Sequence, residues 1–285
     1  MSTPERPFQH FLLTRFNVRV PWMNRPAPGP EWLAHRFDLF ERFCLPSVEA
    51  QSNTDFLWLV FFDSRTPAEF RERISSYRKL PQFRAVFLDE FDLQLVRDAM
   101  RQHSGSDSRS VLTSRLDNDD ALARSYIAKV QEVAYSITEP KAFISIRLGY
   151  TCDHGRAYCS EYVPNAFFSL LEPFEEMSTG YAYNHHDIAK HAPVRVIDGY
   201  RGWMQVVHDA NHANVGPSCA FRVRRSTLRN EFPPALAEGS EPAVGLLANN
   251  ARFIVRRFVR DSGRMVRDRL GLRRDSSRTA PKTGN

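Results

Sequence analysis

Residues Val111 to Asp120 read VLTSRLDNDD, a short apolar run that ends in three acids within four positions. The next ten residues, Ala121 to Val130, have the apolar spacing of a helix. An apolar strand, an acidic loop and a helix in this order are typical of an α/β domain, in which ligands bind at the carboxyl edge of the sheet. We therefore expect these acids to lie at a ligand site.

Two interpretations of the acidic loop follow from its chemistry. Three carboxylates this close repel one another, and solvent, protonation or a divalent cation relieves the repulsion. Their oxygens suit magnesium, manganese or calcium rather than zinc. Alternatively, Asp and Asn cap helices and acids stabilise a first helical turn. A cap needs only one or two such residues, so four in a row favour a site for a cation and a phosphate.

Composition places the chain among ordinary globular proteins. Of its 285 residues, 42% are hydrophobic and 25% are charged. No apolar run approaches the roughly 18 residues that span a bilayer, and no hydrophobic signal core follows the first residues. Four Cys without a C-x-x-C pair are too few for a disulfide framework. We expect a cytoplasmic protein.

The net charge of +6 is concentrated in a tail. From Arg252 onward, ten Arg and one Lys against three Asp give +8, so the preceding 251 residues carry a net charge of −2. A nearly neutral body lacks the basic surface of a nucleic-acid-binding protein. We expect no nucleic-acid partner.

The first 135 residues alternate between strand and helix patterns, which predicts a parallel sheet with right-handed crossovers. The expected strands are 10–15, 56–62, 83–88 and the apolar run from 111, and the expected helices are 31–44, 66–79, 91–103 and 121–135. Pro46 is expected to end the first helix. Thr66, with Pro67 and Glu69, matches a capping box. Residues 56–62 are continuously apolar, as in a strand buried on both faces.

The pattern changes after residue 135. Residues 143–148 and 167–171 resemble strands without a clear helix between them, and 152–158 resemble a turn. From residue 231 the chain is Pro-rich and then Arg-rich. Residues 247–274 place apolar side chains among arginines, which suits the surface of an anionic membrane. Alternatively, this segment is a helix that packs its apolar stripe on the domain and leaves its arginines in solvent.

At this point the residues resemble a known group. The loop Arg115–Asp120 resembles the Asp-x-Asp site of GT-A-fold glycosyltransferases, and the chain over roughly 8–215 more closely resembles the rhamnosyltransferase family. The other segments that carry this resemblance are Phe11–Asn17, Arg36–Phe40, Phe56–Asp63 and Trp203–His208.

The resemblance implies a GT-A-like, Rossmann-type, mostly parallel α/β sheet flanked by helices, with a mixed, irregular C-terminal half. It implies a glycosyltransferase domain over 8–230, with a nucleotide-sugar-binding half (8–135) and an acceptor half (136–230), followed by a connection and basic tail (231–285). The implied activity is metal-dependent transfer of a sugar, rhamnose by the family's name, from a nucleoside-diphosphate sugar to a glycan or lipid-linked acceptor. The implied cofactor is Mn²⁺ or Mg²⁺.

The resemblance also assigns roles within the acidic loop. Asp117 would lie near the ribose or the sugar, and Asp119 would bind the metal. Asp120 would support Asp119 or take its place, and these two roles stay open. His208 is the best match to a late metal-binding histidine, although a buried histidine that bonds a backbone carbonyl fits the sequence equally well.

Further candidates come from residue types at strand ends. Arg15 and Arg115 could bind a pyrophosphate bidentately, and Arg115 could instead pair with an acid of the loop. Asp63 could contact the base or ribose, or cap the next helix. An inverting enzyme also needs a general base, for which the candidates are Asp153, Glu161, Asp187 and Asp209, with Asp187 and Asp209 preferred.

Two other functions fit the same residues. One is another metal- and phosphate-handling enzyme, such as a nucleotidyltransferase or phosphohydrolase, although the chain has no G-x-x-x-x-G-K-[ST] phosphate loop. The other is a non-catalytic nucleotide-sugar or glycan binding module with a degenerate site.

Overall fold

The computed structural model describes residues 8–21, 29–105, 109–208, 220–237 and 243–269, apart from the side chains of 234, 235 and 260–269. The centre of its sheet is four parallel strands in the order β4-β1-β2-β3. Their bounds are β1 Phe8–Arg15, β2 Leu57–Asp63, β3 Phe83–Leu88 and β4 Ser110–Arg115. The expected parallel sheet of the N-terminal half is confirmed.

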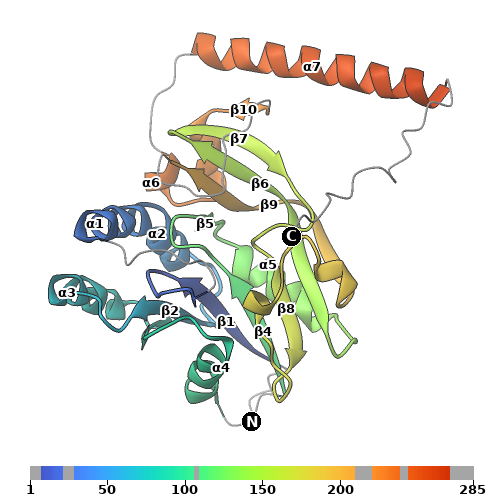
Figure 1. The fold of residues 1–285 in the computed structure, drawn as a ribbon. Helices are drawn as coiled ribbons and strands as arrows, with labels where there is room; N and C mark the ends of the chain where they lie inside the picture. The colour runs from blue at the N-terminus through green and yellow to red at the C-terminus, as the bar shows by residue number, and fades with distance from the viewer. Residues whose placement is uncertain (1–7, 22–28, 106–108, 209–219, 238–242, 270–285) are drawn as a thin grey trace, which may run out of the picture.

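Side chains of the central strands alternate between two apolar layers. Figure 1 shows helices on both sides of these strands. Leu12 and Trp58 face a layer that includes residues of α1 (Pro30–Leu39), α3 (Ala68–Ser76) and α5 (Tyr126–Tyr135). Their neighbours Leu13 and Leu59 face a layer that includes residues of α4 (Leu93–Gln102). Burial on both faces explains why β2 is continuously apolar in the sequence.

The C-terminal half is mixed, as expected. Strand β8 (Ser169–Pro173) runs antiparallel to β4, and β6 (Ala142–Asp153) pairs antiparallel with both β8 and β7 (Arg156–Glu161). The long strand β9 (Val194–Val207) runs parallel to β6 and extends to the acidic loop. The remaining elements of this half are η4 Gly180–Ala182, η5 Ile188–Lys190, β10 Arg222–Val223, η6 Arg225–Asn230, α6 Pro234–Ala237 and α7 Ala243–Arg269.

The chain after the acidic loop differs from the expectation. Residues Ala121–Leu122 form the short strand β5, which pairs antiparallel with Trp203 and Met204 of β9, and α5 begins only at Tyr126. An apolar pair fits either a helix or a strand, and a partner some 80 residues away decides between them. This pairing ties the acidic loop to the end of β9.

The first helical segment also continues further than expected. A wide turn, η2 (Phe40–Cys44), leads into α2 (Leu45–Glu49), and the Leu45 N–H donates to the Phe40 carbonyl oxygen. Pro46 does not end the helix, because it lies in the first turn of α2, where its missing N–H is not needed.

The expected capping box at Thr66 is absent. The Thr66 hydroxyl donates to the Asp63 carbonyl oxygen at 2.7 Å and accepts from Asn17 Nδ2 at 3.0 Å. It therefore stabilises the loop after β2 rather than the first turn of α3. The expected turn over 152–158 is also shorter, since only His154 and Gly155 have positive φ between β6 and β7.

No helix in the described ranges is both long and apolar enough to cross a membrane.

The packing of β6 against β9 yields a stability prediction. A Cβ at Gly149 would lie 2.2 Å from Trp203 Cδ2, and Trp203 is itself buried and stacked on Phe167. We expect Gly149→Ala to lower the free energy of unfolding by about 1–3 kcal/mol, because a close-packed core must shift to admit the methyl group. Urea unfolding of this variant and of Gly105→Ala, whose Cβ would meet no atom within 4 Å, gives the comparison. Equal stability of the two variants would contradict the packing.

Candidate functional site

The carboxyl ends of three central strands meet at one edge of the sheet. Arg15, Asp63 and Arg115 are the last residues of β1, β2 and β4. The parallel register pairs Leu13 with Arg115 and Arg15 with Phe61. The acidic loop continues from β4 at this edge, where ligands bind in open α/β sheets.

Arg36 of α1 is a direct partner of the acidic loop. Its Nη1 donates to Asp119 Oδ2 at 3.0 Å, and its Nη2 donates to Asn118 Oδ1. Asn118 in turn donates from Nδ2 to the Phe16 carbonyl oxygen at 2.9 Å. The Arg36 guanidinium lies 5.5 Å from the centre of the Trp32 ring. Arg36 thus joins α1 to the chain segments that follow β1 and β4.

His208, which directly follows β9, is the second partner of Asp119. Its Nε2 lies 3.0 Å from Asp119 Oδ2, and the two side chains are only 12% and 7% exposed. The His35 ring packs against the His208 ring in an edge-on contact at 5.6 Å. The structure therefore brings together His208 and Asp119, which the sequence had placed in one site.

The protonation of Asp119 follows from these partners. Burial alone would raise its pKa, but the hydrogen bond from His208 and the charge of Arg36 outweigh burial and lower the pKa below its ordinary value. Asp119 is therefore an ionised carboxylate in a nearly dry environment.

Asp120 has the opposite character. It is 3% exposed, and burial, together with the charges of Asp119 and Asp117, raises its pKa well above the ordinary value. Its Oδ1 accepts a hydrogen bond from the Val206 backbone N–H at 2.8 Å. Two effects thus relieve the carboxylate repulsion: the raised pKa favours protonation of Asp120, and Arg36 with His208 compensates the charge of Asp119.

A second group of residues covers the ends of β1 and β4. The Tyr181 ring, carried by η4, lies 4.7 Å from the Arg115 guanidinium carbon and 5.9 Å from that of Arg15. Gly180 permits this close cover, since a Cβ there would lie 3.3 Å from Arg115 Cγ. Within the described ranges, neither guanidinium has a carboxylate partner, and Arg115 Nε is buried without a hydrogen bond. The ion pair between Arg115 and the loop, weighed from the sequence, is not present.

Half-buried Asp117 lies between the two groups. Its charge acts on Tyr181 and His185 as well as on Asp120. The site therefore combines a negative loop with two arginines that lack a carboxylate partner in the described structure.

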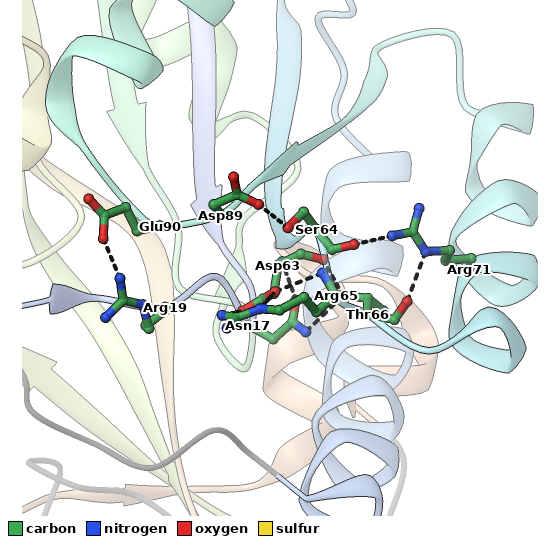
Figure 2. A network of polar contacts seen from close by, with 9 residues as sticks. All are labelled: Asn17, Arg19, Asp63, Ser64, Arg65, Thr66, Arg71, Asp89 and Glu90. Carbon is green, nitrogen blue, oxygen red and sulfur yellow. Dashed lines mark hydrogen bonds and ion pairs between the residues drawn. The ribbon is translucent and has the colours of Figure 1, made fainter.

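Asp63 is engaged by its own loop (Figure 2). Both of its carboxylate oxygens accept from the Arg65 side chain, at 2.9 and 2.7 Å, and the Arg65 backbone N–H donates to it at 2.8 Å. Burial would raise the pKa of Asp63, but these hydrogen bonds lower it. A nucleotide contact with Asp63 would therefore displace the exposed side chain of Arg65.

The candidate bases lie at different places. Asp187 directly precedes η5 without capping it through its side chain, and it is paired with Lys190 at 2.5 Å. Glu161 is exposed and lies 3.9 Å from Arg147 of β6. Asp153 is the register partner of Val207, directly before His208. Asp209 lies outside the described residues.

The residues present offer a divalent cation two protein ligands. Asp119 Oδ2 of the loop after β4 and His208 Nε2 at the end of β9 lie 3.0 Å apart. Mg²⁺ commonly takes one or two carboxylates and completes its shell with phosphates and water. In the described ranges no cluster of three or more metal-binding side chains exists. These two side chains could hold a cation only together with ligands from outside the protein, and Arg36 bonds the same Asp119 oxygen.

Sequence reasoning did not assign a role to Arg36, Asn118 or Tyr181. Arg36 lies in the segment 36–40 that carried the family resemblance, directly before buried Phe37. A cation on the core-facing side of a helix needs a buried anion, and this signal could have identified it. Nothing in the sequence alone places Tyr181 over β1 and β4.

The contrast between the two buried acids yields a pH prediction. The pKa of Asp120 is raised in the folded state. Asp120 therefore contributes stability that is fully present below the unfolded-state pKa of about 3.8 and is lost as the pH rises through the folded-state pKa. We expect Asp120→Asn, which keeps the acceptor for Val206, to gain stability relative to wild type as the pH rises from about 4 to about 8.

Asp119→Asn is the matched control, with the opposite sign. The pKa of Asp119 is lowered in the folded state. Asp119 therefore contributes stability that is present above the unfolded-state pKa of about 3.8 and is lost as the pH falls. We expect this variant to lose about 1–3 kcal/mol at neutral pH and to approach wild type in acid. Urea unfolding across pH measures both, and parallel pH profiles would refute the assignment.

Comparisons with known proteins identify a family for this chain. The family model described as "Putative rhamnosyl transferase" matches residues 27–218. None of the curated proteins compared with the chain matches it. Among solved structures, S. aureus TarS 1–349 in complex with UDP-GlcNAc is 12% identical with a TM-score of 0.45, covering 88% of this chain and 73% of that one.

Two other structures are similarly distant. S. aureus TarS 1–349 alone is 10% identical with a TM-score of 0.42 over 70% of this chain, which spans only 60% of that one. The 4-diphosphocytidyl-2C-methyl-D-erythritol synthase from Anaerococcus prevotii is 10% identical with a TM-score of 0.36, over 69% and 88% of the two chains. These likenesses are weak, so the assignment depends on the family model. Because that model matches about two thirds of the chain, the protein belongs to the putative rhamnosyl transferase family.

Proposed function

We propose that the protein transfers a sugar from a nucleoside-diphosphate sugar to a glycan or lipid-linked acceptor, with rhamnose as the sugar that the family description suggests. The observation that carries the proposal is the ionised, buried Asp119 bound by Arg36 and His208, beside two arginines that have no carboxylate partner among the described residues. TarS has been solved with UDP and with UDP-GlcNAc, and the proposed donor is of the same class.

The donor pyrophosphate accounts for the positive groups. Arg15 and Arg115 lie at neighbouring strand ends and can bind phosphate oxygens. A divalent cation held by Asp119 and His208 would stabilise, as a Lewis acid, the negative charge that develops on the departing diphosphate. Asp117 and Asp63 are the proposed contacts to the ribose or sugar, and Asp120 is proposed to support Asp119 from its buried position.

In the transfer, an acceptor hydroxyl oxygen bonds to the anomeric carbon while the bond from that carbon to the phosphate oxygen breaks. The nucleoside diphosphate leaves with the electron pair, and the hydroxyl proton passes to a carboxylate. Asp209, which follows His208 in the chain, and Asp187 are the proposed bases. Asp153 is a third candidate, since β6 brings it beside the strand end that carries His208.

Donor binding is the first test. We expect one nucleoside-diphosphate sugar from a panel that includes a rhamnose donor to raise the melting temperature, and Mn²⁺ or Mg²⁺ to increase the shift, because a ligand that binds only the folded state stabilises it. Asp119→Ala should abolish the metal-dependent part, and Arg115→Ala should weaken donor binding. Asp98→Ala, which removes an exposed carboxylate from α4, is the matched control. Absence of any shift for every donor with metal present would overturn the proposal.

Competition between Arg36 and the cation yields a second prediction. Because the Arg36 guanidinium bonds the oxygen proposed to bind metal, removing its charge should strengthen Mn²⁺ binding by roughly tenfold. Calorimetry of Arg36→Gln with Mn²⁺ alone measures this directly. Arg42→Gln, an exposed arginine of the same helical segment, is the matched control. Weaker Mn²⁺ binding in a folded Arg36→Gln protein would show that Arg36 organises the site rather than competing for it.

A further inference from the structure

The helix α7 carries an exposed apolar stripe. At about 100° per residue, its exposed large apolar side chains fall within an arc of about 140°. Each of these side chains is between 59% and 78% exposed: Val244, Leu247, Ile254, Val255, Phe258 and Val259. The stripe is about 22 Å long, at 1.5 Å per residue. An apolar surface this continuous marks an interaction site.

The opposite side of α7 contacts the rest of the protein. Asn250 accepts from the Arg222 backbone N–H at 2.8 Å and donates to the Arg222 carbonyl oxygen at 2.9 Å. Asn249 donates to the Ala220 carbonyl oxygen at 3.0 Å, and the Phe253 ring lies 5.9 Å from that of Phe221. Figure 1 shows α7 beside β10 at the margin of the molecule. For the described side chains, from Leu247 to Val259, the alternative in which the helix packs its apolar stripe on the domain is therefore wrong.

Charge indicates what covers the stripe. Residues 243–269 contain seven Arg and two Asp, a net charge of +5, while the chain before Arg252 carries −2. A second copy would place +5 against +5, and the body offers little negative charge to compensate. Among the described side chains, Arg252 and Arg256 follow the stripe along one flank by helical geometry. An apolar face flanked by arginines matches the boundary between acyl chains and anionic headgroups.

We propose that α7 lies flat in the headgroup region of an anionic lipid bilayer, with the stripe from Val244 to Val259 inserted and its arginines near the lipid phosphates. The contact is peripheral, because the helix does not have the apolarity needed to cross a membrane. It is independent of sugar transfer, so the two proposals can fail separately.

Vesicle flotation of the full-length protein tests the proposal. The vesicles are phosphatidylcholine alone, and phosphatidylcholine with phosphatidylglycerol in equal amounts. We expect binding to the anionic vesicles only, and weaker binding at high salt because salt screens the arginines. Ile254→Gln with Phe258→Gln should lower the bound fraction roughly tenfold by removing inserted apolar area. Leu95→Gln, an exposed apolar residue of α4, should bind like wild type.

Each other outcome overturns the proposal. Equal binding to both kinds of vesicle that does not change with salt would show that the arginines do not contribute to the contact. The protein could instead fail to bind either vesicle and form a dimer in analytical ultracentrifugation. If Ile254→Gln with Phe258→Gln dissociated that dimer, the stripe would be the contact surface for a second copy. Failure to bind vesicles with a monomeric protein would leave an acidic protein partner as the occupant. Circular dichroism of the double variant confirms that α7 is retained, since both side chains are exposed and hold no internal contact with the core.

Discussion

The burial of two adjacent acids, Asp119 and Asp120, at the edge of the sheet is the constraint on which the arrangement around the site depends. An ionised group in a dry environment is tolerated only with charged or hydrogen-bonding partners. Asp119 obtains them from α1 and from the end of β9, and Asp120 obtains a backbone N–H from β9. The acidic loop therefore fixes the position of a helix and a strand that are distant in sequence. The N-terminal and C-terminal halves meet where the charge must be neutralised.

Local patterns in the sequence were sufficient for the central sheet. The continuous apolar run of β2 and the loop after β4 predicted a parallel sheet with acids at its carboxyl edge, because burial on both faces leaves no polar positions. The sequence could not show that Ala121 and Leu122 form a strand, since their partner lies in β9. It also missed Arg36, because side-chain pairing between α1 and the loop depends on how the helix docks. Residues whose role depends on local pattern were predictable, whereas those whose role depends on packing between distant segments were not.

The electrostatics of the site are arranged in two parts. Arg36 and His208 compensate the ionised Asp119 internally, whereas Arg15 and Arg115 have no carboxylate partner in the described structure and lie over aromatic rings. Cations held over aromatic faces retain much of their attraction for an anion. An arriving diphosphate would thus meet positive charge that is already positioned, and would not have to break an ion pair to reach it. Preorganisation of this kind reduces the cost of binding.

The thiol of Cys44 lies fully buried within the electrostatic reach of the same acids. Burial, reinforced by the charges of Asp120, Asp119 and Asp117, raises its pKa well above the ordinary value. Since only the thiolate reacts readily, this cysteine is inert while the helical segment around it stays docked. Its rate of alkylation would therefore measure how often the helical segment opens locally, and Cys44 can serve as an internal probe of conformational fluctuations at the site.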